Sequence, residues 1–145
     1  MSSIRVVVAG YGNVGRGVLA ALKNNPDMEV AGVVSRNPDR VKKSFNEVPV
    51  MQINDVDAWL EALKPDVAIL CGGSKDDLPV QGPALAAKIN TVDSFDNHSR
   101  IPEYFAVMDE AAKAAAAREA DLRRLPGKAE ERRHRHSGGD RCTAP

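Results

Sequence analysis

The feature that most constrains the fold is a buried-strand pattern that runs directly into a glycine turn. Residues 4–9 read IRVVVA and residues 10–15 read GYGNVG, so three glycines follow a β-branched run with the spacing G-x-G-x-x-G. In a strand–turn–helix context each glycine has its own steric task. The first permits the tight turn, the second leaves the backbone open to a pyrophosphate, and the third lets helix and strand pack closely. The pattern predicts a dinucleotide-binding turn.

The residues of this turn are the first candidates for cofactor contacts. The helix that follows would present unpaired main-chain N–H groups and the positive end of its dipole to the phosphates. The alternative is a strand-to-helix turn that holds no ligand, which the flanking pattern makes the weaker interpretation. The candidates are Gly10, Tyr11, Gly12, Asn13, Val14 and Gly15.

Short apolar runs alternate with helix-period segments from residue 4 to about residue 95. Such alternation predicts βαβ units and a parallel sheet covered on both faces. The expected class is α/β, a Rossmann-type doubly wound parallel sheet of about five strands, followed by a C-terminal helix and a disordered tail. We expect the segment RNPDR, residues 36–40, to be a turn. The expected strands are 4–9, 29–35, 48–53, 66–71 and 90–95, and the expected helices are about 14–24, 56–63 and 79–89, with a last helix from Pro102 that carries Phe105, Met108 and Ala112 on one side.

The end of the second expected strand predicts which dinucleotide is preferred. NAD-binding folds place an acidic residue there to accept the ribose hydroxyls, whereas this chain reads Ser35-Arg36-Asn37. A guanidinium pairs with the extra phosphate of NADP and stacks on adenine. We therefore expect NADP, with Ser35 and Arg36 as candidate contacts. The alternative is that Arg36 is an ordinary solvated loop residue.

A second glycine turn closes the fourth expected strand. Carboxyl ends of parallel strands border the ligand crevice of an open α/β sheet, so we expect Cys71, Gly72, Gly73 and Ser74 to face the nicotinamide half of the cofactor. An apolar run precedes Cys71 and no activating histidine or lysine is identifiable. We interpret Cys71 as a small buried hydrophobe rather than a nucleophile. We expect no metal site.

The charge balance argues against several classes of partner. Twenty basic and twenty acidic residues cancel, which removes the positive field that nucleic-acid or anionic-membrane binding usually needs. No apolar stretch approaches the roughly 20 residues of a membrane span. The two cysteines lie in dissimilar surroundings and are not expected to pair, so we expect a cytoplasmic location.

The composition changes after about residue 114. Residues 118–145 contain seven arginines and five acidic residues but no valine, isoleucine, methionine or aromatic residue. Such a segment buries too little apolar area to offset its ordering entropy. We expect a frayed continuation of the last helix and then a solvated tail. The expected organisation is a dinucleotide-binding domain at 1–117 and a polar, arginine-rich tail at 118–145.

Four segments together resemble the meso-diaminopimelate dehydrogenase family. They are VAGYGNVGRG (8–17), VSRNP (34–38), LCGGSKDDLPVQGP (70–83) and NTVDSFDNHSRIPEY (90–104). The likeness covers roughly residues 3–114, and its last segment is the most particular. The resemblance implies an NADP-dependent enzyme of bacterial lysine biosynthesis that is a homodimer at full length. It oxidatively deaminates the D-configured centre of meso-2,6-diaminopimelate to L-2-amino-6-oxopimelate, which cyclises to tetrahydrodipicolinate.

The resemblance also adds substrate candidates. It implies that Asp93 and Asp96 face the ammonium group of the substrate, which a carboxylate at a strand end can hold by a charge-assisted hydrogen bond. Without the resemblance both read as turn-forming residues, and that alternative stays open. Asn37 stands where a second arginine is common in the family, which weakens the expected NADP preference. His98 lies in a polar loop and is interpreted as solvated, so no catalytic residue is assigned.

The tail departs from the family, whose members continue into a separate substrate and dimerisation region. We therefore expect a truncated form, without that region, that binds NADP and does not turn over diaminopimelate. Two alternatives stay open: another Rossmann reductase of amino-acid metabolism, such as a relative of dihydrodipicolinate reductase or homoserine dehydrogenase, and a non-catalytic NADP-binding module. An unpaired strand at 90–95 would be a sheet edge and would favour self-association.

Overall fold

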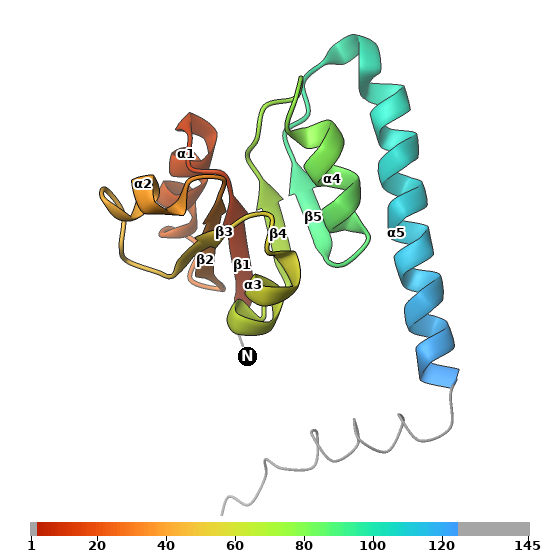
Figure 1. Ribbon diagram of the computed structural model, residues 1–145, viewed down its shortest axis with the longest axis horizontal. Helices are drawn as coiled ribbons and strands as arrows, with labels where there is room; N and C mark the ends of the chain where they lie inside the picture. Colours follow the sequence, from red (N-terminus) through yellow and green to blue (C-terminus); the bar gives the residue numbers. More distant parts are fainter. Residues whose placement is uncertain (1–2, 125–145) are drawn as a thin grey trace, which may run out of the picture.

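The structure, a computed structural model, describes residues 3–124 and confirms the predicted alternation of strands and helices (Figure 1). The tail was expected at 118–145: the last helix continues to Arg124, and residues 125–145 lie outside the described range. The strands are β1 (Ile4–Ala9), β2 (Met28–Ser35), β3 (Val50–Gln52), β4 (Val67–Leu70) and β5 (Asn90–Asp93). The helices are α1 (Asn13–Leu22), α2 (Pro38–Lys42), α3 (Val56–Leu63), α4 (Leu78–Ala86) and α5 (Ile101–Arg124), and a short 3-10 turn, η1 (His98–Arg100), precedes α5.

The strands form one parallel sheet in the order β3-β2-β1-β4-β5, which is the doubly wound arrangement expected. The chain winds from β1 outward to β3 and then returns to β4 on the other side of β1. The strand order therefore reverses between β1 and β4. Ligands of such sheets bind at this switch point, outside the carboxyl ends of the strands.

The core consists of two apolar layers, one on each face of the sheet. Val6 and Val8 point to the layer that contains Leu19 of α1 and Val41 of α2. Val7 points to the opposite layer, whose largest members come from α3 and α4. Because helices cover both faces, residues 6–9 are fully buried, as the unbroken apolar run of β1 requires. The members of the second layer include Trp59, Leu63, Leu78 and Leu85.

The turn expected at residues 36–40 is wrong, because the chain forms the short helix α2 there. Asn37 caps this helix: its Oδ1 accepts a hydrogen bond from the Arg40 main-chain N–H at 3.2 Å. Pro38 occupies the first helical position, where its missing N–H costs nothing and its fixed φ suits the helix. Asn-Pro was therefore a helix start rather than a turn.

The last helix carries Phe105, Met108 and Ala112 on one side, as expected, since all three line one pocket beside β5. Tyr104 and Met108 of α5 approach α4, while Phe105 is 69% exposed and Ala112 is also exposed. Gly82 of α4 permits the close approach, since a Cβ at this position would lie 2.3 Å from the Tyr104 hydroxyl oxygen. Contacts with α4 thus set the rotation of α5, which runs beside it (Figure 1). None of the described helices has the length and apolar character that a membrane span needs.

Candidate nucleotide-binding site

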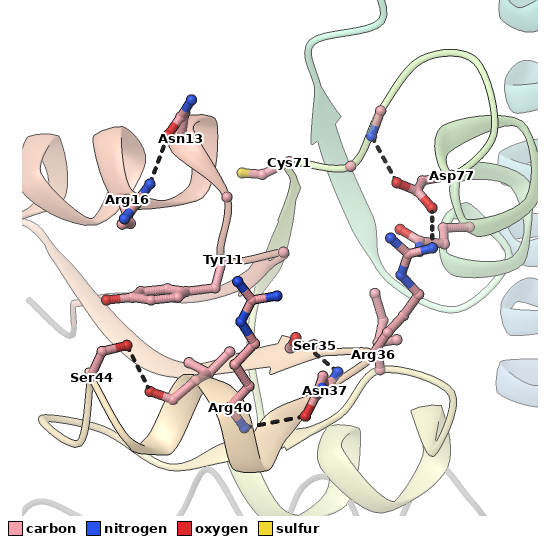
Figure 2. A pocket seen from close by; sticks show the side chains of 17 residues that line it. Tyr11, Asn13, Arg16, Ser35, Arg36, Asn37, Arg40, Ser44, Cys71 and Asp77 are labelled. Atoms are coloured by element: carbon pink, nitrogen blue, oxygen red, sulfur yellow. Dashed lines mark hydrogen bonds and ion pairs between the residues drawn. The ribbon is translucent and has the colours of Figure 1, made fainter.

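A cavity of about 650 Å³ opens at the carboxyl edge of the sheet, across the switch point. Three segments enclose it: the turn after β1, the loop after β2 that continues into α2, and the turn between β4 and α4 (Figure 2). Val14, Gly15 and Ser74, which were also predicted to contact a cofactor, do not line it. The predicted residues that do line it are Gly10, Tyr11, Gly12, Asn13, Ser35, Arg36, Cys71, Gly72 and Gly73.

The three glycines of the first turn differ in their surroundings. Gly10 has a φ of +109°, a left-handed conformation that side chains disfavour. A Cβ on Gly15 would lie 2.0 Å from the Gly10 carbonyl oxygen, so this glycine allows α1 to pack against the turn. A Cβ on Gly12 would meet nothing within 4 Å. The turn is therefore tight at Gly10, close-packed at Gly15 and open at Gly12.

Helix α1 begins beside the cavity without a side-chain cap. Its N-cap residue is Gly12, and its first turn contains no acidic residue. The Asn13 side chain instead accepts a hydrogen bond from Arg16 Nη2 at 2.7 Å. The first main-chain N–H groups of a helix lack intrahelical partners and carry the positive end of its dipole. This end of α1 is chemically suited to an anion.

The loop after β2 and the first turn of α2 contribute two arginines to the lining of the cavity, Arg36 and Arg40. The other polar side chains of the loop have local partners, because Ser35 Oγ accepts a hydrogen bond from the Asn37 main-chain N–H at 3.1 Å and Asn37 caps α2. Arg16 of α1 also lines the cavity. Sequence reasoning missed Arg16 and Arg40. The helix-start signal at Asn37-Pro38 could have found Arg40, because it places that residue in the first turn of α2.

An ion pair joins two walls of the cavity. Arg36 Nη1 lies 3.0 Å from Asp77 Oδ1, and Asp77 Oδ2 accepts a hydrogen bond from the Gly73 main-chain N–H at 3.0 Å (Figure 2). The pair connects the loop after β2 with the start of α4. Sequence reasoning missed Asp77, since nothing local indicates that its carboxylate meets an arginine 41 positions earlier.

Cys71 and Gln81 line the cavity on the side of β4 and α4. Cys71 is 9% exposed, and burial raises the pKa of its thiol to about 11. Its thiol is therefore protonated near neutral pH, which agrees with a small buried hydrophobe rather than a nucleophile. Gln81 Oε1 is buried and has no hydrogen-bond partner among the described residues. A buried acceptor of this kind is suited to a donor from a ligand.

The two aspartates predicted for the substrate lie apart from this cavity. Asp93 Oδ2 accepts a hydrogen bond from the Tyr104 hydroxyl at 2.8 Å, and its Oδ1 accepts one from the Phe95 main-chain N–H at 3.1 Å. Burial, followed by this contact with Asp93, raises the pKa of Tyr104 above its ordinary value. The Asp96 main-chain N–H donates to Ser74 Oγ at 2.9 Å, which joins the loops after β4 and β5. Their contact with substrate stays a prediction.

No group of three or more side chains suited to a metal ion occurs in the described part of the chain. Fold and cavity nevertheless define a class. A parallel α/β sheet with an open glycine turn at its switch point is a dinucleotide-binding Rossmann-fold domain. The model of an oxidoreductase family with an NAD-binding Rossmann fold matches residues 4–93, and this chain belongs to that family.

Similar proteins of known activity indicate which members of this family the chain resembles. The chain is 47% identical over 113 residues to the meso-diaminopimelate D-dehydrogenase of Ureibacillus thermosphaericus, a match that covers 78% of this chain and 34% of the relative. The solved diaminopimelate dehydrogenase of Corynebacterium glutamicum in complex with diaminopimelate superposes with a TM-score of 0.70 at 42% identity, over 79% of this chain and 34% of that one. An engineered D-amino-acid dehydrogenase bound to NADP+ gives a TM-score of 0.70 at 41% identity with the same coverage, 79% and 34%.

These matches confirm the resemblance that the four sequence segments indicated. The chain spans about one third of the length of the relatives it matches, as their 34% coverage states.

Proposed function

We propose that the cavity binds NADP and that the protein uses it in the oxidative deamination of meso-2,6-diaminopimelate. One observation carries the cofactor assignment: the open Gly12, the uncapped start of α1 and the guanidinium of Arg36 line one cavity at the switch point. The names of the relatives support the substrate.

The residues of the cavity fit a dinucleotide. The uncapped N–H groups at the start of α1 would hold the pyrophosphate, with open space at Gly12 for its approach. Gln81 Oε1, buried without a partner in the described part, would accept a hydrogen bond from the nucleotide. Arg16 and Arg40 add positive charge to the cavity. A polar, positively charged cavity of about 650 Å³ supports a phosphorylated ligand rather than an apolar one.

The choice of NADP over NAD rests on the end of β2. No carboxylate follows Ser35, so the residue type that accepts ribose hydroxyls in NAD-binding folds does not occur there. Arg36 has the fork of donors that suits the 2′-phosphate. Asn37 adds no second cation, because its side chain is a neutral amide, and the oxygen of that amide caps α2. The preference is therefore assigned to Arg36.

When bound, the nicotinamide ring supplies the hydride acceptor for oxidation of the carbon that bears the amino group. The chain's own residues bind and orient the reactants. Of the two candidate aspartates, we assign Asp96 to the substrate ammonium group, because it is exposed and its loop is tied to Ser74 at the β4 edge. We assign Asp93 to the support of that loop, since both of its carboxylate oxygens have partners within the β5–α5 junction.

The proposal separates nucleotide binding from turnover. Because the chain spans about one third of its relatives, deamination is proposed for the whole protein and nucleotide binding for the described residues. We therefore expect the 145-residue chain to bind NADP without turning over diaminopimelate. Rapid reduction of NADP+ by the purified chain in the presence of diaminopimelate would contradict this part.

Parallel calorimetric titrations with NADP+ and NAD+ test the assignment of Arg36. We expect the wild-type chain to prefer NADP+, and Arg36→Ala to weaken NADP+ binding by about 10- to 100-fold, since hydrogen bonds between charged groups contribute about 1.5–3 kcal/mol. Binding of NAD+ should change little. Arg100→Ala is the matched control, because Arg100 is exposed, pairs with Glu103 and does not line the cavity. Equal binding of both nucleotides by all three proteins would contradict the assignment.

A further inference from the structure

Among the described residues that line the nucleotide cavity, one has a carboxylate side chain, and that residue is Asp77. Its two oxygens have different partners: one lies 3.0 Å from Arg36 Nη1, and the other accepts the Gly73 main-chain N–H at 3.0 Å. Asp77 also stands at the N-cap position of α4. The carboxylate is thus attached to the turn after β4 while it faces an arginine from the loop after β2 (Figure 2).

The two members of this ion pair differ in their freedom to move. The Asp77 side chain is 20% exposed, whereas the Arg36 side chain is 71% exposed. A long, solvated arginine can change rotamer at little cost, while a carboxylate held by a main-chain N–H and surrounded by protein cannot. Any rearrangement of the pair therefore moves Arg36 and leaves Asp77 in place.

A phosphate at the 2′ position places new demands on the pair. The phosphate and the Asp77 carboxylate compete for the same guanidinium, and the two anions repel each other at short range. A nucleotide with a neutral 2′-hydroxyl creates neither effect, because Arg36 can stay with Asp77. The carboxylate therefore opposes binding of the phosphorylated nucleotide only.

We propose that Asp77 is a specificity-determining residue, whose pairing with Arg36 lowers the preference for NADP over NAD that Arg36 creates. The inference rests on the proposed function, since it requires the adenosine end of the nucleotide beside Arg36. The end of β2 lacks the acidic residue of NAD-binding folds. Asp77 brings a carboxylate to the neighbouring guanidinium from a different loop.

Asp77→Asn tests this proposal without removing the local support of the turn. The amide oxygen of asparagine still accepts the Gly73 N–H, and asparagine is a favoured N-cap residue. Calorimetry on the 145-residue chain should find that the variant binds NADP+ roughly two- to fivefold more tightly, the range of an exposed ion pair. Its affinity for NAD+ should equal that of the wild type. The gain should shrink at high salt, which screens the charges.

Three further variants test whether the effect comes from the Asp77–Arg36 pair. Asp76→Asn is the matched control, because it makes the same change in net charge at an exposed neighbour that does not line the cavity. It should leave both affinities unchanged. In the Arg36→Ala background, Asp77→Asn should produce a smaller gain for NADP+ than in the wild type, since no guanidinium is left to compete for. Asp77→Ser, which also removes the charge and places another favoured residue type at this N-cap position, repeats the measurement if the asparagine variant does not fold.

The outcomes separate this inference from the proposed function. Unchanged or weaker NADP+ binding by both Asp77 variants, or an equal gain in Asp76→Asn, would overturn the role of Asp77 alone. Failure of the wild-type chain to bind either nucleotide, or an Arg36→Ala variant that binds NADP+ as the wild type does, would overturn the proposed function and this inference together.

Discussion

Burial determines the chemistry of Cys71. Desolvation raises the pKa of its thiol to about 11, so the reactive thiolate forms only in alkaline solution. We expect the folded chain, carrying Cys142→Ser so that one thiol remains, to react with iodoacetamide at a rate that keeps rising up to about pH 11. The same chain unfolded in urea should react at half its maximal rate near the ordinary cysteine pKa of about 8.5. A half-maximal rate near that same pH for the folded chain would mean that the thiol is solvated.

Substitutions at Gly10 and Gly12 distinguish an effect on folding stability from an effect on nucleotide binding. A methyl group at position 12 meets open space. A residue with a side chain at position 10 must adopt a φ of +109° beside Cys71. Gly12→Ala should therefore lower the free energy of unfolding by less than about 1 kcal/mol, since the methyl group meets no clash and the only cost is that alanine is a poorer N-cap residue than glycine. It should weaken NADP+ binding at least about tenfold, because the methyl group stands where the pyrophosphate approaches.

Gly10→Ala is the counterpart of this variant. Its strained φ should lower the free energy of unfolding by more than about 1 kcal/mol. Urea unfolding and calorimetry on both variants check the contrast. If Gly12→Ala binds NADP+ as the wild type does, the pyrophosphate does not lie over this turn.

At the scale of elements, the junction of β5 and α5 is joined by one partly buried hydrogen bond. The Tyr104 hydroxyl donates to Asp93, and the Tyr104 ring stacks on Phe95 with centroids 4.0 Å apart. Tyr104→Phe keeps the stack and removes the donor, so we expect a loss of about 0.5–1.5 kcal/mol in the free energy of unfolding. Tyr11→Phe is the control, since the Tyr11 ring also packs against an aromatic ring, that of Phe45 at a centroid distance of 5.4 Å, but not at the junction of β5 and α5. Equal losses in both variants would show that the Asp93 contact is not what stabilises the junction.

The elements that sequence reasoning located are those whose signal is local. Apolar runs and the strand–glycine–helix pattern predicted all five strands and the turn at Gly10, because burial and backbone sterics act within a few residues. The rotation of α5 relative to α4 was not predicted, since Gly82 and Asp93, which lie outside this helix, decide it. The missed cavity residues Asp77 and Gln81 reach the site from α4 only through the strand order.

At the scale of the whole molecule, the cavity joins the two halves of the doubly wound sheet. The half made of β1, β2 and β3 contributes the glycine turn and Arg36, and the half made of β4 and β5 contributes Gly72, Gly73 and Asp77. Between these halves the sheet is continuous only through the pairing of β1 with β4. A ligand in the cavity therefore contacts both sides of the switch point and stabilises the packing of the two halves of the sheet together.

Nucleotide binding should accordingly stabilise the molecule as a unit. At an NADP+ concentration of 100 times its dissociation constant, linkage adds about 2.7 kcal/mol to the free energy of unfolding. Urea unfolding should detect this increase in the wild type and a smaller one in Arg36→Ala at the same nucleotide concentration. Under native conditions, hydrogen exchange should slow most at residues 10–13, 36–37 and 72–73, which line the cavity, and least at the opposite sheet edge near Asn25 and Asp66. Protection confined to one half would mean that the nucleotide does not bridge the switch point, because a ligand that spans it must order the carboxyl ends of β1, β2 and β4 together.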